Sequence, residues 1–88
     1  MNRTEEIRRR LSAALSPSEL AVRDDSHKHI GHAGARDGRG HFHVRIKSAA
    51  FNGQSRIASQ RMVYAALGDL MQTDIHALAM DVLPEEPA

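Results

Sequence analysis

Residues 41–47 alternate strictly between polar and apolar side chains, and this pattern constrains the fold more than any other feature of the sequence. Every second residue is apolar: Phe42, Val44 and Ile46. The residues around them are polar or charged: His41, His43, Arg45 and Lys47. Because successive side chains of a strand point to opposite faces, the segment predicts a strand with one buried face and one solvated face.

The flanking segments predict the other elements. Apolar residues at helical spacing, from Ile7 to Leu15, indicate a first helix that Asn2 or Thr4 could cap and that the proline after Ser16 ends. Residues 20–25 read as a strand that forms a hairpin with residues 41–47, joined by a loop over residues 26–40. A second helix is expected from Arg56 to about residue 73, and its apolar stripe is Ile57, Val63, Leu67, Leu70 and Met71.

Residues 75–82 are apolar on both faces, which is typical of a central strand covered by helices. The order helix, strand, strand, helix, strand predicts an α+β fold, with a three-stranded mixed sheet and helices packed on one face. The 88 residues are expected to form a single domain over residues 1–88. Its ordered core would span about residues 3–82, and residues 83–88 would form a frayed tail.

Composition excludes several classes of function. The chain has no cysteine, so it supplies no disulfide, zinc knuckle or thiol nucleophile. A net charge of +1 gives no electrostatic reason to bind nucleic acid or a membrane surface. No apolar run approaches the roughly 20 residues of a membrane-spanning helix, and the charged first residues do not resemble a signal peptide. We therefore expect a cytoplasmic protein without a membrane partner.

Histidine is the anomaly of the composition, because five of the six histidines fall between residues 27 and 43. His29 and His32 lie three residues apart, and imidazole is a ligand for zinc, iron and copper. Without thiolates the chain cannot close a structural metal site alone, so any such site is incomplete or completed by another molecule. From the residues alone, solvent-facing histidines without a role are the more frequent case.

His76 opens the last strand, in phase with Leu78 and Met80. It is either a half-buried histidine bonded to the backbone or a metal ligand that faces the long loop. Catalysis by Ser26 with a neighbouring histidine lacks any supporting motif, so no enzymatic activity is expected. Four cations could contact phosphates, although a solvated face explains them equally well: Arg45, Lys47, Arg56 and Arg61.

Several runs together resemble the BolA family. They are Gly40-His41-Phe42-His43-Val44-Arg45-Ile46-Lys47-Ser48, Phe51-Asn52-Gly53, Arg61-Met62-Val63-Tyr64 and Ile75-His76-Ala77-Leu78-Ala79. The resemblance covers essentially the whole chain and implies a fold like a type II KH domain. It also implies a heterodimer with a monothiol glutaredoxin, in which the two proteins share a bridging [2Fe–2S] cluster and the glutaredoxin supplies its cysteine and a bound glutathione.

The family's carboxyl-terminal histidine ligand maps onto His76. Its loop ligand maps onto His32 when counted back from the strand at Gly40, and onto His29 when counted forward from the preceding strand. We prefer His32, since the strand is the more rigid reference. A chain without cysteine would be of the histidine-only type, and imidazole replaces thiolate on one iron of Rieske clusters.

The resemblance also carries a second functional hypothesis. Family members are linked to transcriptional regulation in stress and to cell shape, through a helix-turn-helix-like segment that would span residues 49–71 here. The near-zero net charge disfavours tight DNA binding at physiological salt, so DNA is a weak partner at most. Gln60 stands where the family usually has a histidine, and the free chain could form a homodimer.

Overall fold

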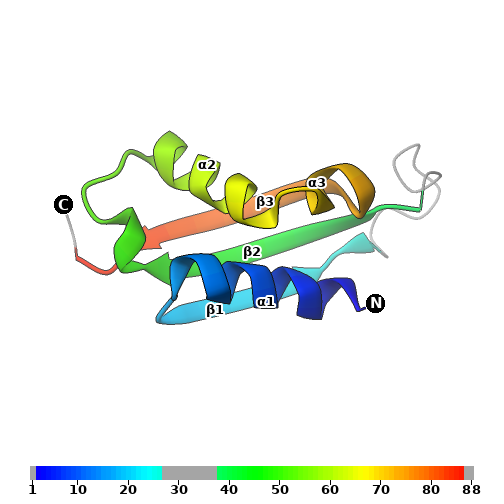
Figure 1. The fold of residues 1–88 in the computed structure, drawn as a ribbon, viewed down its shortest axis with the longest axis horizontal. Helices are drawn as coiled ribbons and strands as arrows, with labels where there is room; N and C mark the ends of the chain where they lie inside the picture. Colours follow the sequence, from blue (N-terminus) through cyan, green and yellow to red (C-terminus); the bar gives the residue numbers. More distant parts are fainter. Residues whose placement is uncertain (1, 27–37, 87–88) are drawn as a thin grey trace.

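The computed structural model describes residues 2–26 and 38–86, which form a sheet and a layer of helices (Figure 1). The elements follow in the order α1 (Arg3–Leu15), β1 (Glu19–Asp24), β2 (Gly40–Ser48), η3 (Ala49–Phe51), α2 (Arg56–Leu67), α3 (Leu70–Thr73) and β3 (Ile75–Pro84). The predicted α+β class and element order are confirmed, with η3 and α3 as short additions. None of the helices in these ranges is long and apolar enough to cross a membrane.

The strands of the described chain form one mixed sheet in the order β1, β2, β3. β1 pairs with β2 antiparallel, and β2 pairs with β3 parallel. β2 is therefore the central strand and β3 an edge strand, so the expectation that the last strand is central is wrong. Ala77, Ala79 and Asp81 of β3 are exposed. The segment reads as apolar on both faces because of its alanines, which are small enough to lie in water at little cost.

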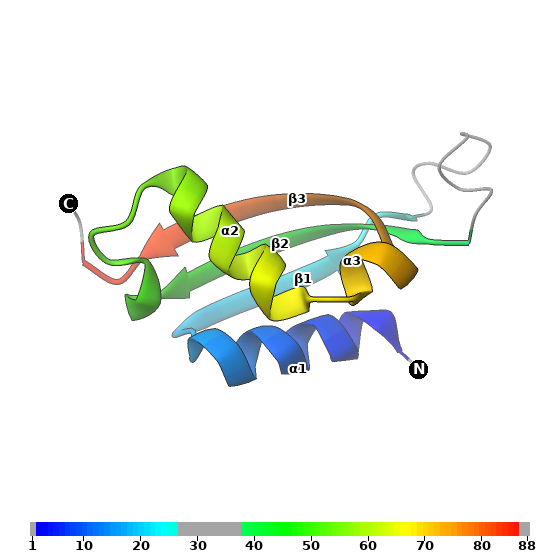
Figure 2. The same ribbon diagram turned by 45° about the horizontal axis from the view of Figure 1, so that its top comes forward.

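The helices that the structure describes all lie on one side of the sheet, as predicted (Figure 2). On that side Phe42, Val44 and Ile46 are at most 2% exposed. They pack in one core with apolar residues of the helices and of the start of β3: Ile7, Leu11, Leu15, Phe51, Val63, Leu67, Leu70 and Ile75. The other side of β2 is half-buried or exposed, which confirms the predicted alternation.

The second helix differs from its prediction in two ways. α2 ends at Leu67, because Gly68 adopts a positive φ of 54° and the chain resumes as the short α3. Its buried stripe consists of Ser59, Val63 and Leu67, whereas Ile57 is 60% exposed. Residues four apart share one face of a helix, so a stripe through Val63 and Leu67 continues to Ser59 and not to Ile57.

Charged side chains join α1 to the rest of the helical layer. Glu6 accepts hydrogen bonds from Arg9 and Arg10, and these bonds lower the pKa of Glu6 to about 2. Arg10 also donates to the carbonyl oxygen of Leu67 at 2.9 Å and to the carboxylate of Asp69 at 2.6 Å. The guanidinium of Arg10 thereby ties α1 to the end of α2.

The carboxyl-terminal strand is longer than predicted. β3 continues to Pro84, two residues beyond the expected end at Val82. The side-chain oxygen of Asn52 then accepts the backbone N–H groups of Glu85 at 2.9 Å and Glu86 at 3.1 Å. The chain is thus held as far as residue 86, where fraying from residue 83 was expected, and residues 87–88 lie outside the described part.

Candidate functional site

The end of the sheet that carries Gly40 is fixed by backbone hydrogen bonds. The N–H of Gly40 donates to the carbonyl oxygen of Asp74 at 2.8 Å, and the N–H of His41 donates to the hydroxyl of Ser26 at 3.0 Å. The N–H of Asp25 donates to the carbonyl oxygen of His41 at 2.8 Å. These bonds join the end of β1, the start of β2 and the turn before β3.

Gly40 is required at this end for steric reasons. A Cβ atom on Gly40 would lie 2.6 Å from Cε2 of Phe42 and 2.8 Å from the hydroxyl oxygen of Ser26. Contacts below 3.0 Å force something to shift, and Phe42 is only 2% exposed, so its ring has little room to yield. The absence of a side chain at Gly40 is what lets the phenyl ring and the Ser26 hydroxyl close around the start of β2.

A β-bulge in β3 determines where His76 lies. Gly40 is in register with Ile75, but the next residue, His41, is in register with Ala77. His76 is the extra residue, and such an insertion re-aims the side chains around it. Ile75 is 1% exposed and His76 is exposed, whereas Leu78 is half-buried. The expectation that His76 is in phase with Leu78 is therefore wrong.

The bulge brings His76 beside His41. Their ring centroids are 5.2 Å apart, with an angle of 47° between the ring planes. His41 is half-buried, and its Nε2 atom is shielded from solvent. Next to His41 lies a shallow depression of about 210 Å³, lined by Asp25, His41, Phe42, Ala77 and Ala79.

Arg39 contacts the second ring of the pair. Its Nη2 atom lies 3.1 Å from Nδ1 of His76. Arginine has no hydrogen-bond acceptor, so Nδ1 of His76 accepts this bond. The bond was not predicted, because nothing in the sequence relates residues 39 and 76 until the parallel pairing of β2 and β3 is known.

The candidate histidines differ in what the structure describes of them. His76 lies near the start of β3, and His41 stands beside it although His41 was not predicted to be a ligand. The signal for His41 was present, since the alternation placed it on the solvated face at the end of a strand. The loop candidates His29 and His32 lie outside the described residues, so their place relative to His76 stays a prediction.

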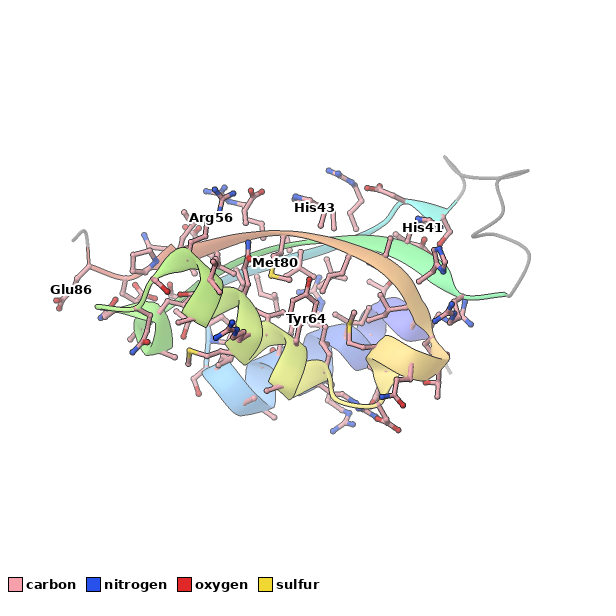
Figure 3. The ribbon with its side chains drawn as sticks, turned by 90° about the horizontal axis from the view of Figure 1, so that it is seen from above. His41, His43, Arg56, Tyr64, Met80 and Glu86 are labelled. Atoms are coloured by element: carbon pink, nitrogen blue, oxygen red, sulfur yellow. The ribbon has the colours of Figure 1, made fainter. Side chains whose placement is uncertain are left out.

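His43 follows His41 on the same face of β2, and its Nε2 atom lies 3.1 Å from the carboxylate of Asp81. Figure 3 shows His41 near the end of the molecule and His43 further along the strand. His43 therefore already has a carboxylate partner within the sheet, and the pair of interest is His41 and His76.

The described residues supply donors that suit a metal ion but do not complete a site for one. Imidazole nitrogens are suitable ligands for iron, zinc and copper. Within residues 2–26 and 38–86, no group of three or more histidine, aspartate or glutamate side chains is arranged to hold a metal ion. The pair of rings offers two donors at most, so a centre built here from these residues needs further ligands from outside them.

The four cations predicted for nucleic-acid binding come from two elements, β2 and α2. Arg45 and Lys47 lie on the open side of β2, above a depression that also contains Glu19 and Glu85. Arg56 begins α2 and lines a cleft of about 340 Å³ with Asp81, and this cleft adjoins the depression because Leu83 and Pro84 line both. Arg61 is exposed five residues further along the helix, which corresponds to a rotation of about 140° from Arg56.

Comparisons with known proteins identify the class. The family model described as BolA-like protein matches residues 11–86, so the chain belongs to the BolA family. It is 42% identical over 79 residues to SufE-like protein 1 of Arabidopsis thaliana, covering 84% of this chain and 21% of that protein. It is 37% identical to the DNA-binding transcriptional regulator BolA of Escherichia coli, covering 86% of this chain and 70% of that protein.

The solved structures agree with the family. The BolA domain of SufE1 from Arabidopsis thaliana superposes with a TM-score of 0.83 at 34% identity, covering 97% of this chain and 94% of that one. The chain thus corresponds to nearly all of that BolA domain, although it spans only about a fifth of the length of SufE-like protein 1. The mixed sheet with helices on one side is therefore the architecture of a BolA domain.

Proposed function

We propose that this BolA-family protein is a non-enzymatic adaptor that binds a monothiol glutaredoxin and shares a bridging [2Fe–2S] cluster with it. The observation that carries the proposal is the pair of His41 and His76, whose rings lie 5.2 Å apart at the end of the sheet. The glutaredoxin would supply its cysteine and a bound glutathione as thiolate ligands, and this chain would supply imidazole. Such an adaptor would act in cluster trafficking or iron homeostasis.

The chemistry of the donors supports this division of ligands. The chain has no cysteine, so it has no thiolate to offer an iron ion. Two histidines replace two cysteines on one iron of Rieske clusters, so a centre with mixed sulfur and nitrogen ligands is chemically sound. His76 is the first ligand of the proposal. The second is a loop histidine, His32 or His29, or the neighbouring His41.

The test is a titration of the purified chain with cluster-loaded monothiol glutaredoxin and glutathione in the absence of oxygen. Visible absorption and circular dichroism report the ligands of the cluster, and size-exclusion chromatography reports the complex. We expect a changed cluster spectrum in a one-to-one heterodimer. His76→Gln should abolish this change, because the variant removes an imidazole ligand while leaving an exposed polar side chain.

Four further variants complete the experiment. His41→Gln, His32→Gln and His29→Gln are compared with one another, and the variant that loses the cluster spectrum identifies the second ligand. His43→Gln is the matched control, since His43 lies on the same face of β2 but is bonded to Asp81. If the wild-type chain gives no complex and no spectral change, the adaptor proposal is wrong.

DNA binding is the second candidate, and the relative from Escherichia coli that is named a DNA-binding transcriptional regulator favours it. The helix cations Arg56 and Arg61 would contact phosphate groups. Their double replacement by alanine should weaken binding to duplex DNA uniformly and lower the salt slope by about one per lost phosphate contact. The double variant Arg45→Ala with Lys47→Ala tests the open side of the sheet in the same assay.

A further inference from the structure

We infer that Arg39 opposes metal binding at the proposed ligand His76, because its hydrogen bond occupies the lone pair through which the imidazole would bind a metal. The inference rests on the proposed function and deepens it, because it concerns how that same site is kept closed before a cluster arrives. Its structural basis is the bond of 3.1 Å between Nη2 of Arg39 and Nδ1 of His76.

The protonation states follow from the donor inventory. A guanidinium has only N–H donors and keeps its charge at every physiological pH, so the nitrogen of His76 that faces it must be an acceptor. A neutral imidazole has one N–H and one lone pair. With Nδ1 of His76 accepting from Arg39, the proton lies on Nε2, and neither nitrogen has a free lone pair to offer a metal ion.

Metal binding at either nitrogen therefore breaks the contact with Arg39. If Nδ1 is the ligand, the guanidinium has to leave the lone pair. If Nε2 is the ligand, the proton moves to Nδ1, and two donors then face each other. In both cases the loss of one hydrogen bond to a charged group opposes ligation of His76.

The position of Arg39 also allows its guanidinium to leave Nδ1 of His76. Arg39 directly precedes Gly40, whose N–H donates to the carbonyl oxygen of Asp74, and the next N–H, that of His41, donates to the hydroxyl of Ser26. The backbone at the base of the arginine thus stays in place while its long side chain turns about several bonds. A partner that brings an anionic thiolate-ligated cluster can attract the guanidinium away from Nδ1 without any change in the sheet.

The consequence is selectivity for delivered metal. The free chain presents His76 with its lone pair already in use, which lowers its affinity for a single divalent ion that arrives from solution. A cluster held by a docked protein is attached at other ligands, so it can tolerate the cost of displacing Arg39.

The first measurement is the tautomer of His76 in the free chain, read from the ring nitrogen shifts of protein labelled with ¹⁵N. We expect the tautomer with the proton on Nε2 in the wild type and a shift toward a mixture in Arg39→Met, which keeps the length of the side chain but has no donor. Arg39→Lys should restore the wild-type tautomer. Arg45→Met is the matched control, since it makes the same replacement at an exposed arginine of β2 that lies opposite Asp81 in the sheet register.

The second measurement is a Zn²⁺ titration followed at the His76 ring, with the backbone amide spectrum as a check that each variant is folded. Loss of one hydrogen bond should tighten Zn²⁺ binding at His76 by about fivefold to tenfold in Arg39→Met. Arg45→Met should leave it unchanged. A wild-type tautomer with the proton on Nδ1, or equal Zn²⁺ affinity in wild type and Arg39→Met, overturns the inference.

A third arm separates this inference from the proposed function. Each variant is mixed with cluster-loaded monothiol glutaredoxin, and Arg39→Met should keep the heterodimer spectrum that His76→Gln loses. If the tautomer of His76 depends on Arg39 but neither the wild type nor any variant forms a cluster complex, the inference about Arg39 stands and the adaptor proposal is wrong. If the cluster spectrum requires His76 but the tautomer of His76 is the same in wild type and Arg39→Met, the adaptor proposal stands and the inference about Arg39 is wrong.

Discussion

β2 presents two faces from the same nine residues, one covered by the helices and one open. On the covered face, the apolar side chains of Phe42, Val44 and Ile46 are almost completely buried, and the strand ends at the buried Ser48. On the open face the side chains are nitrogen-containing and polar or charged, from His41 at one end of the strand to Lys47 at the other. The two sets are separated by a single residue along the chain, so stability and the proposed chemistry are assigned to alternate positions of one strand.

The difference between the faces extends to their charges. In the helical layer, Glu6, Arg10 and Asp69 are paired with one another, and they contribute to holding the helices in place. On the open face, the rings of His41 and His76 lie next to each other at the bulged end of the sheet. A change on the covered side should therefore alter folding, and a change on the open side should alter binding.

The largest expected effect contrasts two adjacent residues. Ile46→Ala removes buried apolar volume, and we expect the free energy of unfolding to fall by about 2–5 kcal/mol. Arg45→Ala, one residue earlier and exposed, should change it by less than about 0.5 kcal/mol. Urea denaturation followed by circular dichroism measures both. Equal losses in the two variants would show that the open face of β2 also carries stability.

A smaller loss of stability is expected at Gly40, the first residue of β2. Gly40→Ala places a methyl group against the Phe42 ring and the Ser26 hydroxyl. Overpacking of this kind costs about 1–3 kcal/mol of stability. Because the side chain of Phe42 is the closest neighbour, Phe42→Leu should make Gly40→Ala less costly. A double-mutant cycle by thermal denaturation measures this coupling, and strict additivity would contradict the proposed clash.

The smallest effect concerns the paired charges of the helical layer. The pKa of Glu6 is lowered to about 2 by hydrogen bonds from Arg9 and Arg10. A carboxylate whose pKa is lower in the folded chain stabilises the fold fully above its unfolded value, and this contribution is lost as the pH falls through the folded value. Stability should therefore decrease between about pH 4.5 and about pH 2.

The Glu6→Gln variant isolates that contribution. Glutamine does not titrate, so the variant should be less stable than the wild type at pH 7 and should approach it near pH 2. Denaturant midpoints across this range give the comparison. A constant difference between the two proteins from pH 7 to pH 2 would mean that the ion pairs of Glu6 do not contribute to stability.

The fold was predictable where one pattern was unambiguous. A strict period of two admits only a strand, so β2 and its buried face followed directly from the residues. β3 was harder, because its alanines count as apolar in a sequence but are tolerated in water at the edge of a sheet. Ile57 is a similar case, since an apolar residue at helical spacing was exposed once the helix was oriented by Val63 and Leu67.

The candidate site was predictable only in part. His76 was identified from the resemblance to the BolA family, but its direction depends on one extra residue in the pairing of β2 with β3. A bulge of that kind has no periodic signature, and it reversed the face expected for His76. That His41 and Arg39 lie next to His76 follows only from the parallel pairing of β2 with β3, which joins residues more than 30 positions apart.

The hydrogen bonds that Asp25 and Ser26 form with the backbone of His41 have a consequence for engineering. They join the end of β1 to the start of β2, so this end of the hairpin is closed by hydrogen bonds among described residues. Loop closure costs only about 0.6 kcal/mol for each doubling of length. A change of length within residues 27–37 should therefore cost little stability, because the hydrogen bonds of Asp25 and Ser26 to His41 close the hairpin without it.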